Sequence, residues 1–172
     1  NMKCPWCSNP EGMKPEGVLV TEKEWLLEEV CPRHAIQDGK LEREICRSCR
    51  ERQCIMKHRT KGIRLSYEDV NTDDLVEEAV SNSLMFYDGG GVTFTGGEAT
   101  VQFSELLGVL KKLRAEEIHT ALETNGTHLR LRECFPYISQ LIMDCKLCDD
   151  AKHRQFTGVS NVQIMENIRE AA

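Results

Sequence analysis

Short strands and helices alternate along the second half of this chain of 172 residues, and this alternation is the strongest constraint on its fold. Runs rich in β-branched and aromatic residues predict strands at 92–95, 119–123 and 140–144. Apolar residues at a helical period predict helices between them, at 103–116 and 129–135. Strands and helices in this order form βα units around a parallel sheet. The sequence therefore predicts an α/β fold.

Further elements are expected on either side of these units. Asn71 or Thr72 can cap a helix whose first turn holds two aspartates, and we expect this helix to run to about Tyr87. A short helix is predicted at 24–30 and a last helix at 162–171, and the stretch after Asp149 is expected to be irregular.

Acidic and flexible residues follow each of the three predicted strands. The binding site of a parallel βα fold lies at the carboxyl ends of its strands, so these residues are expected to converge on one site. Side chains alternate along a strand, which puts Asp144 and Lys146 on one face and Cys145 on the other, buried under a helix. Cys134 is also expected in the core. The three segments are Gly96-Gly97-Glu98, Glu123-Thr124-Asn125-Gly126 and Asp144-Cys145-Lys146.

A pair of cysteines stands near the start of the chain, in Cys4-Pro5-Trp6-Cys7. Such a C-x-x-C pair alone is equally compatible with a zinc knuckle or a thioredoxin-like redox site. A cysteine directly before Asn1 would complete C-x3-C-x2-C, in which three thiolates hold a 4Fe–4S cluster and leave one iron open for S-adenosylmethionine (SAM). The chain opens inside this motif and closes within a helical run. We therefore interpret it as a fragment truncated at both ends, and expect it to be inactive without that first cysteine.

A cysteine-rich segment at 21–61 interrupts the chain, and we interpret it as a small ferredoxin-like insert between core segments at 1–20 and 62–172. It contains a polar, hairpin-like stretch at 38–40. Its first cysteine begins the sequence Cys-Pro-x-x-Ala-Ile, which resembles the end of a bacterial ferredoxin half.

The insert has enough cysteines for one auxiliary 4Fe–4S cluster, held by Cys31, Cys46, Cys49 and Cys54. The competing interpretation is a zinc site, with tetrahedral sulfur and nitrogen ligands from Cys46, Cys49, Cys54 and either His58 or Cys31. A third interpretation leaves the cysteines unliganded in a polar loop.

Composition excludes several classes of function. The 22 basic and 28 acidic side chains give a net charge of −6, which argues against a nucleic-acid footprint and a polybasic membrane surface. No apolar run approaches the roughly 20 residues of a membrane span, and no signal peptide is visible. Nine cysteines in short clusters favour metal ligation in a reducing cytoplasm over a disulfide framework. We therefore expect a cytoplasmic protein that binds neither nucleic acid nor membrane.

Five motifs occur in a fixed order along essentially the whole chain: Cys-x-x-Cys-Ser-Asn-Pro-Glu-Gly, the insert, Gly-Gly-Gly-Val-Thr-Phe-Thr-Gly-Gly-Glu, Glu-Thr-Asn-Gly, and Asp-x-Lys followed by His153, Gly158 and Asn161. Each motif is weak, but the ordered set is specific. It resembles the glycyl-radical-enzyme activating enzymes, the radical SAM family of pyruvate formate-lyase activating enzyme. This resemblance implies an incomplete (β/α) barrel of radical SAM type.

The resemblance also implies roles for single residues. Glu98 would accept a charge-assisted hydrogen bond from the SAM ammonium group, and Lys146 would face the SAM carboxylate. Glu123, Thr124 and Asp144 match positions that hold a monovalent cation beside SAM. The implied cofactor-binding residues are Trp6, Cys7, Ser8, Gly96, Gly97, Glu98, Glu123, Asn125, Asp144 and Lys146, and the implied metal ligands are Cys4, Cys7, Cys31, Cys46, Cys49 and Cys54.

Plainer interpretations of several residues stay open. Trp6 is equally compatible with a core aromatic, and Glu98 with a solvated carboxylate after a turn. His153 fits the family pattern, but a single histidine is more often structural. Relatives usually have proline after the glutamate, where this chain has Ala99. The last alternative is a third metal pair made by Cys145 and Cys148.

The implied activity is reductive cleavage of SAM at the cluster, after which a 5′-deoxyadenosyl radical abstracts the α-hydrogen of a glycine in a partner glycyl radical enzyme. A flavodoxin or ferredoxin would supply the electron under anaerobic conditions. The cofactors carry this chemistry, so no catalytic acid or base is predicted among the side chains. Two alternatives are a radical SAM enzyme that acts on a small molecule and a non-enzymatic iron–sulfur or zinc module.

Overall fold

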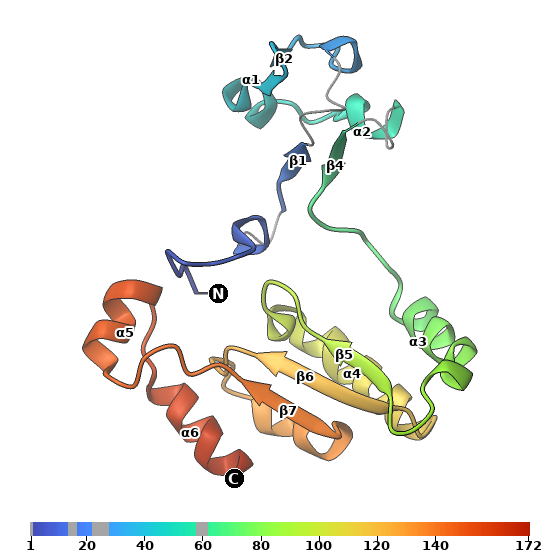
Figure 1. The fold of residues 1–172 in the computed structure, drawn as a ribbon, viewed down its shortest axis with the longest axis vertical. Helices are drawn as coiled ribbons and strands as arrows, with labels where there is room; N and C mark the ends of the chain where they lie inside the picture. Colours follow the sequence, from blue (N-terminus) through green and yellow to red (C-terminus); the bar gives the residue numbers. More distant parts are fainter. Residues whose placement is uncertain (1, 14–16, 22–27, 58–61) are drawn as a thin grey trace. The chain divides into compact units, whose positions relative to one another are not determined.

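The computed structural model describes residues 2–13, 17–21, 28–57 and 62–172, which divide into two compact units (Figure 1). The first unit comprises 1–15 with 69–172, and the second comprises 16–68. The predicted insert at 21–61 lies within the second unit, and its boundaries stay a prediction. No helix among the described residues is long and apolar enough to cross a membrane.

A three-stranded parallel sheet forms the centre of the first unit, in the order β5-β6-β7 (Figure 1). Within this register Phe94 lies beside Leu122, and Leu122 beside Leu141. The parallel sheet is confirmed, whereas the partial barrel of radical SAM type stays a prediction. The strands span Gly91–Phe94 (β5), His119–Thr124 (β6) and Gln140–Met143 (β7), each within a residue of its predicted end.

Helices cover one face of this sheet, because successive side chains of a strand point to opposite faces and the more buried ones, such as Phe94, Leu122 and Leu141, share that face. The core contains Leu122 and Leu110, both 0% exposed, packed with Phe94 and Leu141. The covering elements are α4 (Phe103–Ala115) and the 3-10 helix η6 (Leu131–Tyr137), and the short η5 (Ala99–Gln102) precedes α4. Side chains of the opposite face, among them Thr93, Glu123 and Ile142, are exposed.

Helix α3 (Thr72–Ser81) begins where predicted and ends earlier than predicted. The Asn71 side chain accepts from the Asp73 N–H at 2.8 Å, which confirms the expected cap. The helix stops at Ser81 instead of near Tyr87. Its last turn is closed on the Glu78 carbonyl, which accepts from the Ser81 hydroxyl and from the side-chain amide of Asn82 at 2.8 and 2.9 Å. The 3-10 helix η4 (Ser83–Met85) follows.

Two other helix predictions need correction. The helix expected at 129–135 is the 3-10 helix η6, which contains Pro136 and therefore lacks one backbone donor. The stretch after Asp149, expected to be irregular, contains α5 (Asp150–Thr157). Asp149 caps α5 by accepting from the Lys152 N–H at 2.9 Å. Only two residues of α5 are buried, so no apolar period marked it. The last helix, α6 (Val162–Ala171), is confirmed.

The Asp150 carboxylate of α5 leads to a prediction on pH and stability. Hydrogen bonds from Ser160, Arg154 and the Asn161 N–H lower the pKa of Asp150 to about 2. A folded-state pKa below the unfolded value gives stability that is present above the unfolded pKa and is lost as the pH falls through the folded one. We expect D150N to lower the melting temperature at neutral pH and to flatten its decline below about pH 4. Thermal unfolding followed by circular dichroism measures both.

D149N is the matched control for this prediction, because it removes a neighbouring carboxylate but keeps a capping oxygen. Equal acid sensitivity of D150N and the wild type would contradict the assignment.

The second unit consists of short elements. Strands β1 (Leu19–Thr21) and β4 (Ile63–Leu65) pair antiparallel, and β2 (Ile36–Gln37) and β3 (Lys40–Leu41) form the hairpin expected at 38–40. Asp38 and Gly39 both have positive φ, as a tight two-residue turn requires. Of the helix predicted at 24–30, residues 24–27 lie outside the described residues. The helical elements of this unit are η3 (Glu28–Val30), α1 (Arg43–Arg47) and α2 (Gln53–Lys57).

Candidate functional site

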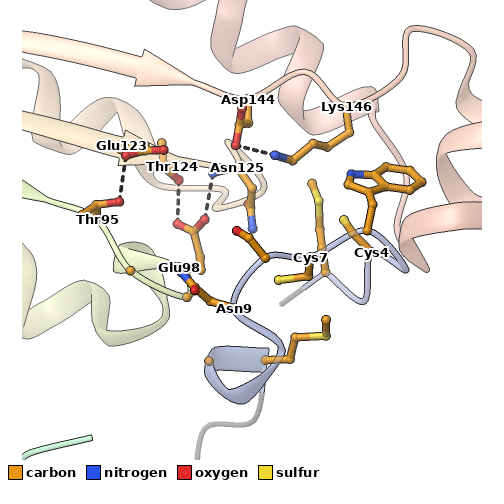
Figure 2. A pocket seen from close by; sticks show the side chains of 17 residues that line it. Cys4, Cys7, Asn9, Thr95, Glu98, Glu123, Thr124, Asn125, Asp144 and Lys146 are labelled. Carbon is orange, nitrogen blue, oxygen red and sulfur yellow. Dashed lines mark hydrogen bonds and ion pairs between the residues drawn. The ribbon is translucent and has the colours of Figure 1, made fainter. Parts of the chain in front are cut away.

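A pocket of about 440 Å³ lies in the first unit at the carboxyl ends of β5, β6 and β7 (Figure 2). It brings together the three strand-end segments and the first cysteine pair, which are far apart in the sequence. What each residue binds stays a prediction. The lining includes Cys4 and all ten predicted cofactor-binding residues, namely Trp6, Cys7, Ser8, Gly96, Gly97, Glu98, Glu123, Asn125, Asp144 and Lys146.

The cysteine pair is held in a tight turn at the pocket wall. The Cys7 N–H donates to the Cys4 carbonyl at 3.1 Å, and the Lys3 N–H donates to the Thr157 carbonyl at 2.9 Å. The 3-10 helix η1 (Pro10–Met13) follows the turn. Figure 2 shows both thiols on the same side of the pocket. Burial raises the pKa of Cys4, and the nearby Lys146 ammonium partly offsets this effect.

Gly97 is required by the close approach of η1 to the end of β5. A Cβ atom at Gly97 would lie 2.4 Å from the carbonyl oxygen of Gly12, inside any allowed contact. The absence of a side chain therefore lets the segment with Cys4 and Cys7 close onto the ends of the strands.

We expect Gly97→Ala to push η1 away from the pocket and to weaken binding of the predicted ligand, SAM, about tenfold or more, because the cysteine turn moves with η1. Isothermal titration calorimetry with SAM measures the loss. Gly108→Ala is the matched control, since a Cβ there has no neighbour within 4 Å. This helical substitution is expected to stabilise the fold by about 0.5–1 kcal/mol. Unchanged affinity in Gly97→Ala would show that the two segments are not in contact.

The Glu98 carboxylate joins the ends of β5 and β6. Its Oε1 accepts from the Thr100 N–H and hydroxyl at 3.0 and 2.5 Å, and from the Thr124 hydroxyl at 2.6 Å. Its Oε2 accepts from the Asn125 N–H at 2.8 Å (Figure 2). Thr100, Thr124 and Asn125 are all buried. Glu98 is therefore an anchored side chain, which contradicts the alternative of a solvated carboxylate.

The polar side of the pocket carries an excess of negative charge. The described lining residues include three carboxylates, Glu98, Glu123 and Asp144, and one ammonium, Lys146. Lys146 forms an ion pair with Asp144 at 2.6 Å, so the two share a face as predicted (Figure 2). Thr95 donates to Glu123 at 2.8 Å. A ligand with positive charge, such as a sulfonium with an ammonium group, suits this lining electrostatically.

The structure also tests the predicted environments of Cys134, Cys145 and Trp6. Cys134 is 0% exposed, which confirms its place in the core, and burial raises the pKa of its thiol to about 11. Cys145 was expected under a helix and is instead exposed. This prediction is wrong because β7 ends at Met143, before alternation can direct Cys145 inward. Trp6 is 50% exposed and contacts the Phe156 ring, so it is not a core aromatic.

His153 has a structural environment. It is 0% exposed, does not line the pocket, and its Nδ1–H donates to the Val159 carbonyl at 2.7 Å. Within the described part of the chain its Nε2 has no hydrogen-bond partner. The structural interpretation of His153 is therefore the better one.

Four cysteines of the second unit also converge. Cys31, Cys46, Cys49 and Cys54 line one small, mostly apolar pocket of about 30 Å³. Burial raises the pKa values of Cys46 and Cys54, and the nearby thiols add to this effect. The backbone N–H of Arg52 lowers the pKa of Cys49. No three potential ligands among the described residues are close enough to hold a single metal ion, and His58 of the zinc alternative lies outside those residues.

Several residues that form or support the site were not among the predicted binding residues, although Asn161 belongs to one of the motifs. Asn9 and Thr95 line the pocket, and Asn9 stands inside a motif that could have indicated it. Two buried asparagines, Asn161 at the N-terminus of α6 and Asn167 within it, donate hydrogen bonds to the loops that follow β6 and β7. Asn167 donates to the carbonyls of Gly126 and His128 at 2.8 and 3.0 Å, after β6. Asn161 donates to two carbonyls after β7, those of Leu147 and Cys148, at 3.0 and 2.8 Å.

Comparison with known proteins gives a consistent group of relatives. The chain is 32% identical to the isethionate sulfite-lyase activating enzyme of Nitratidesulfovibrio vulgaris strain Hildenborough, over 98% of this chain and 60% of that protein. It is 31% identical to the 4-hydroxyphenylacetate decarboxylase activating enzyme of Clostridium scatologenes, over 97% of this chain and 58% of that protein. It is 26% identical to the indoleacetate decarboxylase activating enzyme of Tractidigestivibacter scatoligenes, over 98% of this chain and 59% of that protein.

The chain thus spans about 60% of the length of these curated relatives. No protein-family model matches it. The names of the relatives agree with the resemblance that the ordered motifs predicted, and with the pocket in which those motifs meet.

Proposed function

We propose that this chain, which is homologous over nearly its whole length to the activating enzymes of glycyl radical enzymes, belongs to a protein that cleaves SAM reductively at a 4Fe–4S cluster and generates a glycyl radical on a partner enzyme. The single observation that supports this most strongly is the convergence of Cys4, Cys7 and three strand-end segments on one pocket. Homology and the geometry of the pocket both support the proposal.

The pocket residues fit the groups that the proposal needs. Cys4 and Cys7 would provide two of the three thiolate ligands to the cluster. When bound, the cluster and SAM supply the radical chemistry. The chain itself would bind and orient them. The Oε2 atom of Glu98 accepts one hydrogen bond, from the Asn125 N–H, and can therefore accept another from the SAM ammonium group.

The lysine of the pocket would orient the other end of the amino acid part of SAM. Lys146 is about two-thirds buried and stands 2.6 Å from Asp144, so its charge is directed into the pocket. An ammonium in this place attracts the SAM carboxylate. Glu123, Thr124 and Asp144 would hold a monovalent cation, because the single Lys146 ammonium does not balance the carboxylates of the pocket. This cation is part of the proposal.

The second unit would hold an auxiliary 4Fe–4S cluster. Four cysteines that line one pocket, with Cys-Pro followed by Ala-Ile as in ferredoxin halves, support this over an unliganded loop. Stoichiometric zinc in place of additional iron would overturn it. Iron, sulfide and zinc analysis after anaerobic reconstitution distinguishes the cluster from the zinc site. Only a cluster predicts that C46S/C49S contains less iron and less sulfide than the wild type.

The protein substrate would be a glycyl radical enzyme, and the electron donor a flavodoxin or ferredoxin. The names of the relatives support the first of these by analogy, since each relative is an activating enzyme. A small-molecule substrate is the competing proposal.

Electron paramagnetic resonance tests the proposed activity. The complete protein is reconstituted with iron and sulfide without oxygen, reduced with dithionite, and incubated with SAM and a candidate glycyl radical enzyme. The expected result is release of 5′-deoxyadenosine together with a glycyl doublet that appears only when all components are present. SAM cleavage without a doublet for any glycyl radical enzyme would favour a small-molecule substrate. Absence of SAM binding would defeat the proposal.

A further inference from the structure

Cys145 and Cys148 form a second C-x-x-C pair, which none of the roles above uses. Both are exposed, unlike Cys134 in the core. Burial raises the pKa of Cys145, and a side-chain hydrogen bond with Cys148 adds to this effect, so the two thiols are neighbours. Cysteines at this spacing close into a disulfide in thioredoxin-like proteins. The pair is therefore accessible, and the C-x-x-C spacing allows a disulfide between its two cysteines.

The residues between and around these cysteines belong to the pocket wall. Lys146 lies between them and is paired with Asp144 at 2.6 Å. The segment is fixed at both ends. Before it, the Asp144 N–H donates to the Thr124 carbonyl at 3.0 Å, and after it the buried Asn161 holds the Cys148 carbonyl at 2.8 Å. A disulfide across the segment must therefore be accommodated by residues 145–148, and Lys146 is one of them.

We propose that Cys145 and Cys148 are a reversible thiol–disulfide site, and that closing the disulfide draws Lys146 away from Asp144 and weakens binding of a carboxylate ligand in the pocket. The oxidant is a low-molecular-weight disulfide. One thiol attacks it to give a mixed disulfide and one released thiol, and the second cysteine then displaces the other half. Two protein thiols are oxidised, one small disulfide is reduced to two thiols, and the two protons pass to the released thiols. The effect on ligand binding rests on the proposed function, whereas the disulfide does not.

Peptide mapping tests the disulfide. The reconstituted protein is incubated without oxygen in buffers with increasing ratios of oxidised to reduced glutathione, alkylated, and digested with trypsin. Trypsin cleaves after Lys146, so a Cys145–Cys148 bond links two peptides, 133–146 and 147–152, with a mass two hydrogens below their sum. Fragmentation distinguishes Cys145 from Cys134, which is in the same peptide. C148S is the matched control and should give a glutathione adduct on Cys145 instead. Alkylation of both thiols at every ratio would overturn the proposal.

The effect on the pocket is measured as SAM affinity. We expect the oxidised wild type to bind SAM about tenfold more weakly than the reduced protein, since a charge-assisted contact is lost. C145S/C148S should bind SAM equally at all glutathione ratios, which excludes damage elsewhere. Equal affinity of oxidised and reduced wild type would overturn the link to Lys146. If the reduced protein does not bind SAM, the proposed function fails. In that case two measurements that do not need SAM test the inference. Peptide mapping tests the disulfide, and the reactivity of Lys146 toward an amine-acylating reagent, which is expected to rise on oxidation, tests the release of Lys146.

Discussion

Replacing Cys7 by serine in the complete protein is expected to abolish the proposed SAM cleavage, to below about a thousandth of the wild-type rate. A serine hydroxyl is a poor ligand for iron, and a cluster held by three thiolates has no spare protein ligand to replace the lost one. Cys7 lines the pocket beside Cys4, and no other cysteine of the chain lines it in the described residues. We expect about four fewer irons per chain and loss of the cluster signal in electron paramagnetic resonance.

Two variants make this result specific. C145S removes an exposed thiol outside the proposed ligand set, and it should keep the full iron content and the wild-type rate. C46S/C49S alters only the second unit and should lower iron while leaving the SAM-dependent signal of the first cluster. SAM cleavage by C7S at more than about a tenth of the wild-type rate would show that Cys7 is not a cluster ligand.

Replacing Glu98 by alanine is expected to lower both stability and SAM affinity. The carboxylate is the acceptor for two threonine hydroxyls and two backbone N–H groups, all from buried residues. A buried donor without a partner costs about 1–3 kcal/mol, and water entering the pocket can replace some of these bonds. We therefore expect a loss of about 3 kcal/mol in the free energy of unfolding, measured by denaturant titration. SAM affinity should fall about tenfold or more, because the loop after β6 is no longer held.

The neighbouring carboxylate provides a control for Glu98. Glu123 lies at the same end of the sheet but is exposed, and among the described residues it accepts a hydrogen bond from the Thr95 hydroxyl. E123A should therefore cost less than about 1 kcal/mol of stability. The loss of stability in E98Q should lie between the losses in E98A and E123A. The glutamine amide keeps one acceptor oxygen, but its NH2 group faces another hydrogen-bond donor. Equal stability of E98A and E123A would show that Glu98 does not join the strands.

The sequence alone determined the parallel sheet and the residues at the ends of its strands. Runs of β-branched and aromatic residues placed each strand within a residue of its observed end, and the period of apolar residues placed α4 and α6, because the burial of apolar side chains leaves a local signal in the sequence. The same signal failed for α5, which is polar and is held by its Asp149 cap and by Asp150. The order of the motifs predicted the group of relatives, because this order is read from the sequence without any distance in the folded chain.

Only the tertiary structure decided which side chains meet and how. That Glu98 is bonded to Thr124 and Asn125, that Gly97 stands against Gly12, and that Asn161 and Asn167 support the pocket loops are contacts across long stretches of sequence. The exposure of Cys145 likewise depends on where β7 ends. The physical reason is that a hydrogen bond depends on distances of about 3 Å. Residue order does not specify such distances until the packed sheet and helices fix them.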